Sequence, residues 1–263
     1  MPRLSFLNVI IEVKNVTKRF GGLAAVDACS LSIERGSISG LIGPNGAGKS
    51  TLFNIVAGAY APETGSVVYE DRDTTGLHPH QLFAQGLLRT FQIPHEFSRM
   101  STLENLMMVP AAQVGEDLGS AWFRPGLVGR QERRVRAKAD EVLEFLGLTH
   151  VRDELAGNLS GGQKKLLELG RTMMVDAKVV LLDEIAAGVN RTLLNDLVAN
   201  IRRLNQELGY TFIIIEHDMD MVARLCDPVI VMVQGKVMTQ GHISKVRSNP
   251  DVIDAYFGGK PND

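Results

Sequence analysis

The stretch "SISGLIGPNGAGKST", residues 37–51, joins an apolar strand pattern to a glycine-rich loop and then to the start of a helix. Residues Gly43–Ser50 satisfy the pattern G-x-x-x-x-G-K-[ST] in full. In such a loop the glycines let successive backbone N–H groups curl around a phosphate, and Lys49 reaches the β and γ oxygens. The Ser50 hydroxyl is placed to ligate Mg²⁺. Because strand, helix, lysine and serine are all present, the stretch predicts a phosphate-binding loop rather than an ordinary glycine-rich turn.

A second stretch, "NLSGGQKKLLELG" at residues 158–170, begins a helix with residues that disfavour helices. Ser160 and Gln163 have the S-x-x-Q spacing of a capping box, in which two side chains satisfy backbone N–H groups. Gly161 and Gly162 then fall in the first turn, at a cost of about 1 kcal/mol each relative to alanine. Glycine permits close approach to the backbone, and the N–H groups at a helix N-terminus attract anions. The stretch therefore predicts a helix start that binds an anion.

Polar side chains follow two apolar stretches that are typical of buried parallel strands. Asp183 and Glu184 come after Val179–Leu182, and His217 comes shortly after Thr211–Ile215. Because ligands bind at the carboxyl edge of open α/β sheets, we expect these side chains at one edge. Asp183 would hold Mg²⁺, and Glu184 would orient or deprotonate an attacking water. Alone, two acids after a strand usually mark a helix N-terminus, and one histidine is usually a surface or packed residue; the phosphate loop favours the functional interpretation.

Strand and helix patterns alternate along much of the chain, which indicates an α/β class with a mainly parallel sheet. Strands are expected at Val9–Val13, Ser30–Glu34, Ser37–Ile42, Val67–Glu70, Val179–Leu182, Thr211–Ile215, Val229–Val233 and Val237–Gln240. The extended "RTFQ" ends at Gln92, whose amide would reach Mg²⁺ or water. From residue 93 to about 174 the pattern predicts a helical insertion, with one amphipathic face formed by Val135, Ala139, Val142, Leu143 and Leu146. A last helix is expected between Asn249 and Gly258.

The composition is that of an ordinary globular protein, with 44% hydrophobic and 22% charged residues over 263 positions. A net charge of −2 does not suggest a nucleic-acid binder. Two distant cysteines, Cys29 and Cys226, form no metal or disulfide pattern, which suits a reducing compartment. We expect no signal peptide, and no apolar run approaches the ~18 residues that cross a bilayer. The chain is therefore expected in the cytosol, held at a membrane only by partners.

The phosphate loop, a glutamine, "LSGGQ", "LLDE" and "EHD", taken in order, resemble the ATP-binding subunit of ABC transporters. The resemblance covers essentially the whole chain, and the ordered set is more specific than any one motif. It implies a P-loop NTPase (RecA-like) core with an antiparallel β subdomain and an inserted α-helical subdomain at about 93–174, within a single domain 1–263. It also implies that two subunits close around two ATP molecules. The helix that begins at Ser160, called the signature helix below, would then face the γ-phosphate held by the opposing subunit.

The resemblance also assigns roles to individual residues. Glu184 is implied as the catalytic base, His217 as a contact of the γ-phosphate, and Gln92 as a catalytic link between Mg²⁺ and the helical subdomain. Nucleotide-binding roles are implied for Phe20, Gly43, Pro44, Asn45, Gly46, Ala47, Gly48, Lys49, Ser50, Thr51, Ser160, Gly161, Gly162 and Gln163. The implied magnesium ligands are Ser50, Gln92 and Asp183. Phe20 would stack on adenine, although a core aromatic is an equal alternative.

Finer features resemble the subunit that serves uptake of branched-chain amino acids and related small solutes. These are "RTFQ", the long segment after it, "AAGVN" and "NPDVIDAYFG". The family usually has proline after the catalytic glutamate, whereas this chain has Ile185, so the orientation of the Glu184 carboxylate is in question.

The implied partners are a second ATP-binding subunit, identical or a sister chain, and two integral membrane permease subunits at the cytoplasmic face of the inner (plasma) membrane. Ile93–Met108 is expected to contact a permease through Phe97, Met100, Leu103, Met107 and Met108, unless these fill the local core.

Two other classes were weighed against an ATP-driven transporter subunit. A soluble clamp acting on nucleic acid or the ribosome would draw on the basic run Arg130, Arg133, Arg134, Arg136 and Lys138. Such a run is more often the solvated face of a helix, and the chain shows neither sustained heptads nor a second phosphate loop. A GTPase or small-molecule kinase shares only the phosphate loop, and no N-K-x-D guanine motif is present. The sequence does not identify the solute.

Overall fold

The computed structural model of the chain describes residues 8–90, 96–110, 125–175 and 177–257. Its contacts divide the chain into two compact units. Unit 1 comprises Met1–Gln92, Lys178–Ala186 and Ile201–Asp263, and unit 2 comprises Ile93–Ala177 and Ala187–Asn200. Each unit is therefore built from segments that are distant in sequence.

The first sheet of unit 1 is antiparallel and has the strand order β2-β1-β4-β5. Its strands are β1 (Val9–Phe20), β2 (Leu23–Glu34), β4 (Thr64–Tyr69) and β5 (Arg72–Asp73). The hairpin of β1 and β2 turns at Gly21, whose φ of 59° suits glycine. Both strands are longer than the expected Val9–Val13 and Ser30–Glu34, because bulges interrupt the alternation that a sequence pattern follows.

The second sheet of unit 1 has six strands in the order β10-β9-β3-β8-β7-β6. These are β3 (Ile38–Ile42), β6 (Leu87–Arg89), β7 (Val179–Asp183), β8 (Thr211–Ile215), β9 (Val229–Val233) and β10 (Lys236–Gly241). All neighbouring pairs are parallel except β9 with β10. The strands β3, β7 and β8 are buried along their whole length, which explains their continuous apolar runs. The two sheets confirm the predicted α/β class, with its mainly parallel core and antiparallel β part.

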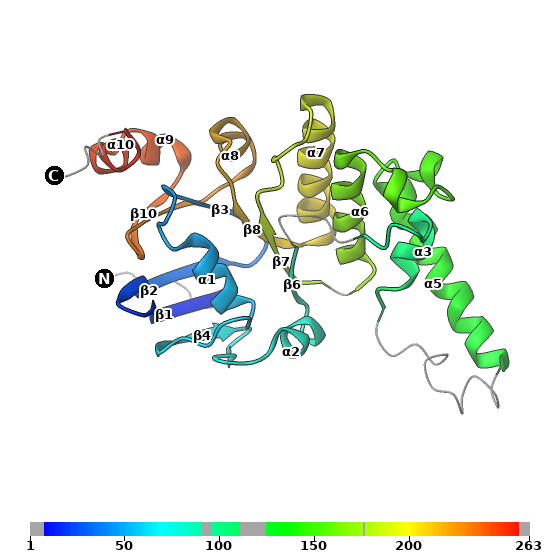
Figure 1. Cartoon of the computed structure of the whole chain (residues 1–263), viewed down its shortest axis with the longest axis horizontal. Coiled ribbons are helices and arrows are strands. Elements are labelled where there is room, and N and C mark those ends of the chain that lie inside the picture. The colour runs from blue at the N-terminus through cyan, green and yellow to red at the C-terminus, as the bar shows by residue number, and fades with distance from the viewer. Residues whose placement is uncertain (1–7, 91–95, 111–124, 176, 258–263) are drawn as a thin grey trace. The chain divides into compact units, whose positions relative to one another are not determined.

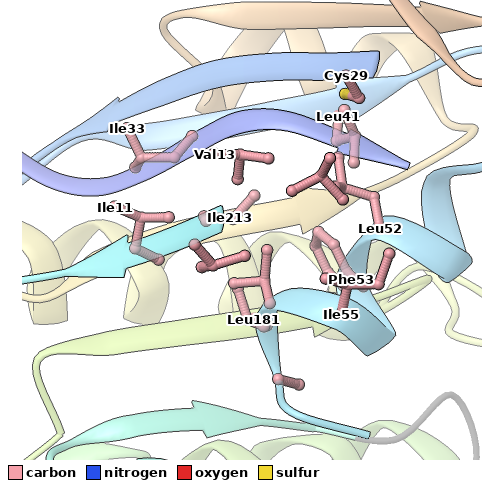
Figure 2. Close-up of a cluster of buried hydrophobic side chains, with 14 of the residues drawn as sticks. Ile11, Val13, Cys29, Ile33, Leu41, Leu52, Phe53, Ile55, Leu181 and Ile213 are labelled. Atoms are coloured by element: carbon pink, nitrogen blue, oxygen red, sulfur yellow. The ribbon is translucent and has the colours of Figure 1, made fainter. Parts of the chain in front are cut away.

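The main core of unit 1 lies where helix α1 (Lys49–Val56) packs against both sheets. Figure 2 shows Ile11 and Ile33 from the antiparallel sheet with Leu181 and Ile213 from the parallel sheet, and Phe53 of α1 beside them. Full burial of an aliphatic or aromatic side chain contributes about 1.5–3 kcal/mol. This packing holds α1 in place, and the phosphate loop that precedes it is fixed in consequence.

Unit 1 also contains four further helices and the last part of α7 (Arg191–Leu208), from Ile201 on, and Figure 1 shows them along the chain. The four helices are α2 (Pro79–Ala84), α8 (Met219–Leu225), α9 (Ile243–Arg247) and α10 (Pro250–Phe257). Helix α10 begins with Pro250, as expected for the last helix, whereas the expected end at Gly258 lies outside the described residues. None of the described helices combines the length and the apolarity needed to span a bilayer.

Unit 2 is helical in the residues that the structure describes. It contains α3 (Thr102–Met107), α5 (Pro125–Phe145), the 3₁₀ turns η3 (Thr149–Val151) and η4 (Ala156–Asn158), α6 (Gly161–Met173) and the first part of α7 (Arg191–Leu208). The predicted apolar face of α5 is confirmed, because Ala139, Val142 and Leu143 are buried. Helix α6 packs closely on this region, since a Cβ on Gly170 would lie 2.8 Å from a Leu146 methyl carbon.

Candidate functional site

The phosphate loop joins β3 to α1, and two of its glycines are required by the backbone. Gly43 has φ 152°, and a Cβ there would lie 2.1 Å from the Met232 carbonyl oxygen. Gly48 has φ 96°, and its Cβ would lie 2.2 Å from the Ala25 carbonyl oxygen. No other residue type fits such contacts. The loop is therefore pressed against β9 and β2, and its path around a ligand is set by these two positions.

Lys49 lies inside this loop with only 6% of its surface exposed. Its Nζ donates to the carbonyl oxygens of Gly43, at 2.8 Å, and of Pro44, at 3.0 Å. Burial lowers the pKa of Lys49, while the charges of Glu184 and Asp183 act in the opposite direction. The amine is thus held where phosphate oxygens bound by the loop would meet it. Ser50, on the first turn of α1, is exposed.

Asp183 ends β7 and is buried beside an arginine that sequence reasoning missed. Arg89, at the end of β6, donates from Nη2 to Asp183 Oδ2 at 3.0 Å and from Nη1 to Asn54 Oδ1 on α1. Asn54 in turn donates from Nδ2 to the Ser50 carbonyl oxygen at 2.8 Å. The chain of contacts joins the start of α1 to the end of β7. The available signal was the arginine of "RTFQ", but its partner lies 94 residues away.

The predicted base and the predicted histidine meet at the same edge of the sheet. Glu184 Oε1 lies 3.1 Å from His217 Nε2. Glu184 has φ 50°, an uncommon conformation for a residue other than glycine, and its N–H donates to the Ile215 carbonyl oxygen at 3.0 Å. The carboxylate is about a quarter exposed and the imidazole nearly half exposed. The structure therefore brings Glu184 and His217 to one edge, as the strand pattern predicted.

A second residue missed by sequence reasoning is Glu216, between β8 and His217. Its side chain is buried and accepts backbone N–H groups from Ala186 at 2.7 Å and from His217 at 3.0 Å. The signal was visible in "IIIEHD", where an acid directly follows an apolar strand. Its partners belong to two separate segments, so only the folded chain reveals them.

Phe20 lies at the end of β1 and is 47% exposed, so the interpretation of it as a core aromatic is wrong. Its ring meets Tyr60 edge to face, with centroids 5.5 Å apart. The Lys18 ammonium lies 5.7 Å from the Phe20 centroid. The ring is thus open to stack on a flat ligand, although nothing in the contacts identifies that ligand.

The signature helix, α6 of unit 2, begins with the predicted capping box. Ser160 Oγ accepts from the Gln163 N–H at 3.3 Å, and Gln163 Oε1 accepts from the Ser160 N–H at 2.9 Å. The two glycines differ. A Cβ on Gly162 would lie 2.4 Å from a Leu193 methyl carbon, whereas a Cβ on Gly161 would meet its nearest described neighbour, the Gly188 carbonyl oxygen, at 3.8 Å. Packing inside the chain explains Gly162 but leaves Gly161 unexplained.

The remaining predicted residues lie either outside the described residues or in the expected permease-contact segment. Gln92, predicted as a catalytic residue and a magnesium ligand, is outside the described residues, as is Ile93. In the expected permease-contact segment, Phe97 and Met108 are exposed. Leu103 is buried in the core of unit 2, which confirms for this residue the alternative that it fills the local core.

Known proteins resemble this chain over nearly its whole length. The ABC transporter family model matches residues 26–187. The chain is 38% identical over 257 residues to a probable branched-chain amino acid transport ATP-binding protein LivG of Archaeoglobus fulgidus, with 97% of each chain covered. It is 38% identical to the high-affinity branched-chain amino acid transport ATP-binding protein BraF of Pseudomonas aeruginosa, covering 95% of this chain and 98% of that one.

One solved structure is similar over nearly the same span. It is the ADP conformation of an ATP-binding cassette of an ABC transporter, with a TM-score of 0.81 and 38% identity. The match covers 95% of this chain and 99% of that chain.

Proposed function

This chain belongs to the ABC transporter family, and from that premise we propose that it energises an importer of branched-chain amino acids or closely related small solutes. Membership makes it a nucleotide-binding subunit that hydrolyses ATP. The choice of solute is supported by relatives that share 38% identity over nearly their whole length and whose names specify branched-chain amino acid transport. Their names specify transport and not a nucleic-acid clamp, and the net charge of −2 gives that alternative no support.

The observation that carries the proposed mechanism is the contact of 3.1 Å between Glu184 and His217 beside the buried Lys49. Glu184 would accept the proton of the water that attacks the γ-phosphate. His217 would hold the carboxylate through Nε2 and lie at the γ-phosphate itself. Lys49 would exchange its two carbonyl partners for phosphate oxygens. Phe20 would stack on the adenine ring.

We propose Mg²⁺ as the metal, since the residues present fit it. The hydroxyl of Ser50 and the carboxylate of Asp183 are hard oxygen donors, which Mg²⁺ prefers. Arg89 fixes one oxygen of Asp183 at 3.0 Å and is itself anchored to Asn54 of the same helix as Ser50, so both donors are held in one framework. When bound, the ion would neutralise charge on the phosphates. Gln92 is proposed as a further ligand.

The signature helix supports a second ATP-binding subunit as partner. Ser160 is exposed, the capping box satisfies its own donors, and Gly161 has space that no contact inside the described chain uses. We propose that Ser160, Gly161 and their neighbours complete the nucleotide site of that partner. The whole chain then acts as one domain, 1–263, with a helical subdomain at about 93–174.

Two permease subunits are the proposed membrane partners. The exposed side chains of Phe97 and Met108 in unit 2 offer apolar surface, and such surface suits the contact of a permease helix. The subunit would then sit at the cytoplasmic face of the inner membrane through these partners and not through a span of its own.

The test replaces Glu184 with glutamine in the transporter assembled with its permeases and partner ATPase. We expect ATP turnover to fall by about 10²-fold or more, because the amide cannot accept the proton, while ATP binding persists. The control is Glu207→Gln, the same change at an exposed glutamate of α7 that pairs with Arg203 on the same helix. Equal turnover of Glu184→Gln and wild type would remove Glu184 from the mechanism. The solute specificity of the transporter is tested by comparing its uptake of labelled leucine with its uptake of an unrelated solute.

A further inference from the structure

The strands β7 and β8 stop pairing immediately before the catalytic pair. Their parallel register runs to Asp183 opposite Ile215, and the Glu184 N–H adds one more bond to the Ile215 carbonyl oxygen at 3.0 Å. The positive φ of 50° at Glu184 then turns the chain out of the sheet. Beyond this point the backbone of neither segment is held by the sheet ladder. Something else must hold Glu184 and His217 at 3.1 Å.

Glu216 bridges the two segments where the ladder ends. Its Oε1 accepts the Ala186 N–H at 2.7 Å, two residues after Glu184. Its Oε2 accepts the His217 N–H at 3.0 Å and the Asp218 N–H at 3.4 Å. One carboxylate oxygen therefore serves each segment. The side chain is 3% exposed, so water does not compete for these bonds.

A carboxylate suits this position better than any neutral side chain. Both of its oxygens accept, and its bonds to N–H groups are about twice as strong as those between neutral groups. A buried acid is costly unless hydrogen bonds satisfy it, and here three N–H groups do so.

We propose that Glu216 is a positioning residue that ties the segment after Glu184 to the segment carrying His217, and so keeps the base and the histidine in contact. The proposal rests on the proposed function, in which Glu184 is the base. The bond that the Ala186 N–H donates to Glu216 restrains the backbone two residues after Glu184.

The experiment compares Glu216→Gln with wild type in the assembled transporter and in the isolated full chain. Glutamine keeps the size but has one acceptor oxygen, so its amide N–H₂ must face the N–H donors of one segment. We expect kcat to fall about 10- to 100-fold, as for a small displacement of a catalytic group, with the KM for ATP within about two-fold of wild type. Amide hydrogen exchange should accelerate about ten-fold or more in peptides covering residues 184–190 and 216–222 and stay unchanged over 43–51.

Two further variants separate positioning from general stability. Thr74→Val removes a buried hydroxyl of unit 1 that donates to the Val67 carbonyl oxygen, away from the catalytic segments. It should lower the melting temperature with kcat unchanged. Glu216→Asp keeps the charge but is one methylene shorter, and it should lower kcat less than Glu216→Gln does. This variant also tests the positioning role if Glu216→Gln does not fold.

The outcomes are distinct. Full kcat in both Glu216 variants, or faster exchange across the whole chain with an equal kcat loss in Thr74→Val, would overturn the positioning role. If Glu184→Gln itself keeps wild-type turnover, the proposed function fails first. If Glu184→Gln is inactive while Glu216→Gln turns over normally, only the present inference is lost.

Discussion

The phosphate loop of unit 1 and the start of the signature helix in unit 2 both have glycines where a helix begins. The atoms that a Cβ at these glycines would meet differ between the two regions. At Gly43 and Gly48 a Cβ would strike backbone oxygen atoms of other strands at 2.1 and 2.2 Å. At Gly162 it would strike the side chain of Leu193 at 2.4 Å, and at Gly161 the nearest described atom is 3.8 Å away. The first loop is thus fixed by backbone contacts of its own chain at both of these glycines. The second is specified by its own chain at one glycine only.

The polar contacts of the two regions differ in the same way. The catalytic edge relies on partners far apart in sequence, such as Arg89 with Asp183, 94 residues away, and Glu216 with Ala186, 30 residues away. The signature helix closes its capping box between Ser160 and Gln163, three residues apart. A region whose donors are satisfied locally is free to present its surface to another molecule. The comparison therefore predicts where substitutions act on folding and where they act only on the assembled transporter.

The largest effect is expected for Gly48→Ala. The residue has φ 96° and its new methyl group would overlap the Ala25 carbonyl oxygen, so the loop must move. We expect a loss of about 3 to 4 kcal/mol in the free energy of unfolding, from backbone strain and overpacking together, and loss of ATP binding. Urea unfolding and nucleotide titration measure both. Gly46→Ala is the control, because φ is also positive, at 78°, but no described atom lies within 4 Å of its Cβ. Equal losses in the free energy of unfolding of the two variants would contradict the steric argument; ATP binding is not compared, because Gly46 belongs to the same binding loop.

Arg89→Met comes next. It removes the arginine paired with the buried Asp183 and the donor to Asn54, and breaking such a pair costs roughly 3 kcal/mol, at the lower end for buried pairs because Arg89 is partly exposed. The matched variant Arg35→Met breaks an ion pair with Glu70 in which the arginine is about half exposed. That change should cost under about 1 kcal/mol, since exposed pairs contribute little. Chemical unfolding of both variants measures the two losses in the free energy of unfolding. Losses of similar size would show that the catalytic edge does not depend on the long-range contact between Arg89 and Asp183.

Gly162→Ala is expected to be milder and to act through packing. The new methyl group would lie 2.4 Å from a methyl carbon and 2.8 Å from Cβ of Leu193 in α7, so the end of that side chain must rotate and its Cβ must shift slightly. Overpacking of about 1 to 3 kcal/mol is partly offset by about 1 kcal/mol of gained helix propensity. We expect a net destabilisation of about 1 kcal/mol, measured by thermal unfolding of the isolated chain. The companion change Leu193→Ala removes the atoms at 2.4 and 3.0 Å but keeps Cβ at 2.8 Å, so it should relieve part of the cost, and a complete absence of relief would show that the Leu193 side chain is not the obstacle.

These contrasts also explain which parts of the fold and of the site could be predicted from the sequence. The buried strands β7 and β8, the phosphate loop and the capping box were predicted, because each is encoded by apolar runs or by spacings of a few residues. Arg89 and Glu216 were missed, since their roles depend on partners brought close only by the parallel register of β6, β7 and β8. Phe20 was ambiguous because burial of a single aromatic at a hairpin end is decided by its surroundings, which leave it half exposed.

The strands β1 and β2 show a further limit. Only their outer parts were predicted, since charged residues and register shifts obscure the alternation between Val13 and Phe20. Bulges of this kind are invisible to a pattern of period two. The fold class was recoverable because the parallel core is continuous and apolar, whereas the lengths of the antiparallel strands were not.

The smallest effect on folding is expected for Gly161→Ala, and it gives the sharpest test of the comparison. The Cβ has room inside the chain, and alanine favours the helix, so the isolated subunit should gain up to about 1 kcal/mol of stability. Yet the methyl group would stand where we propose that the partner's nucleotide approaches, so turnover of the assembled transporter should fall about ten-fold. Gly129→Ala in α5 is the control, because it also removes a helical glycine with space around it and should add similar stability without changing turnover. If both variants turn over ATP like wild type, Gly161 is not reserved for a partner, and the two regions differ only in how the chain packs.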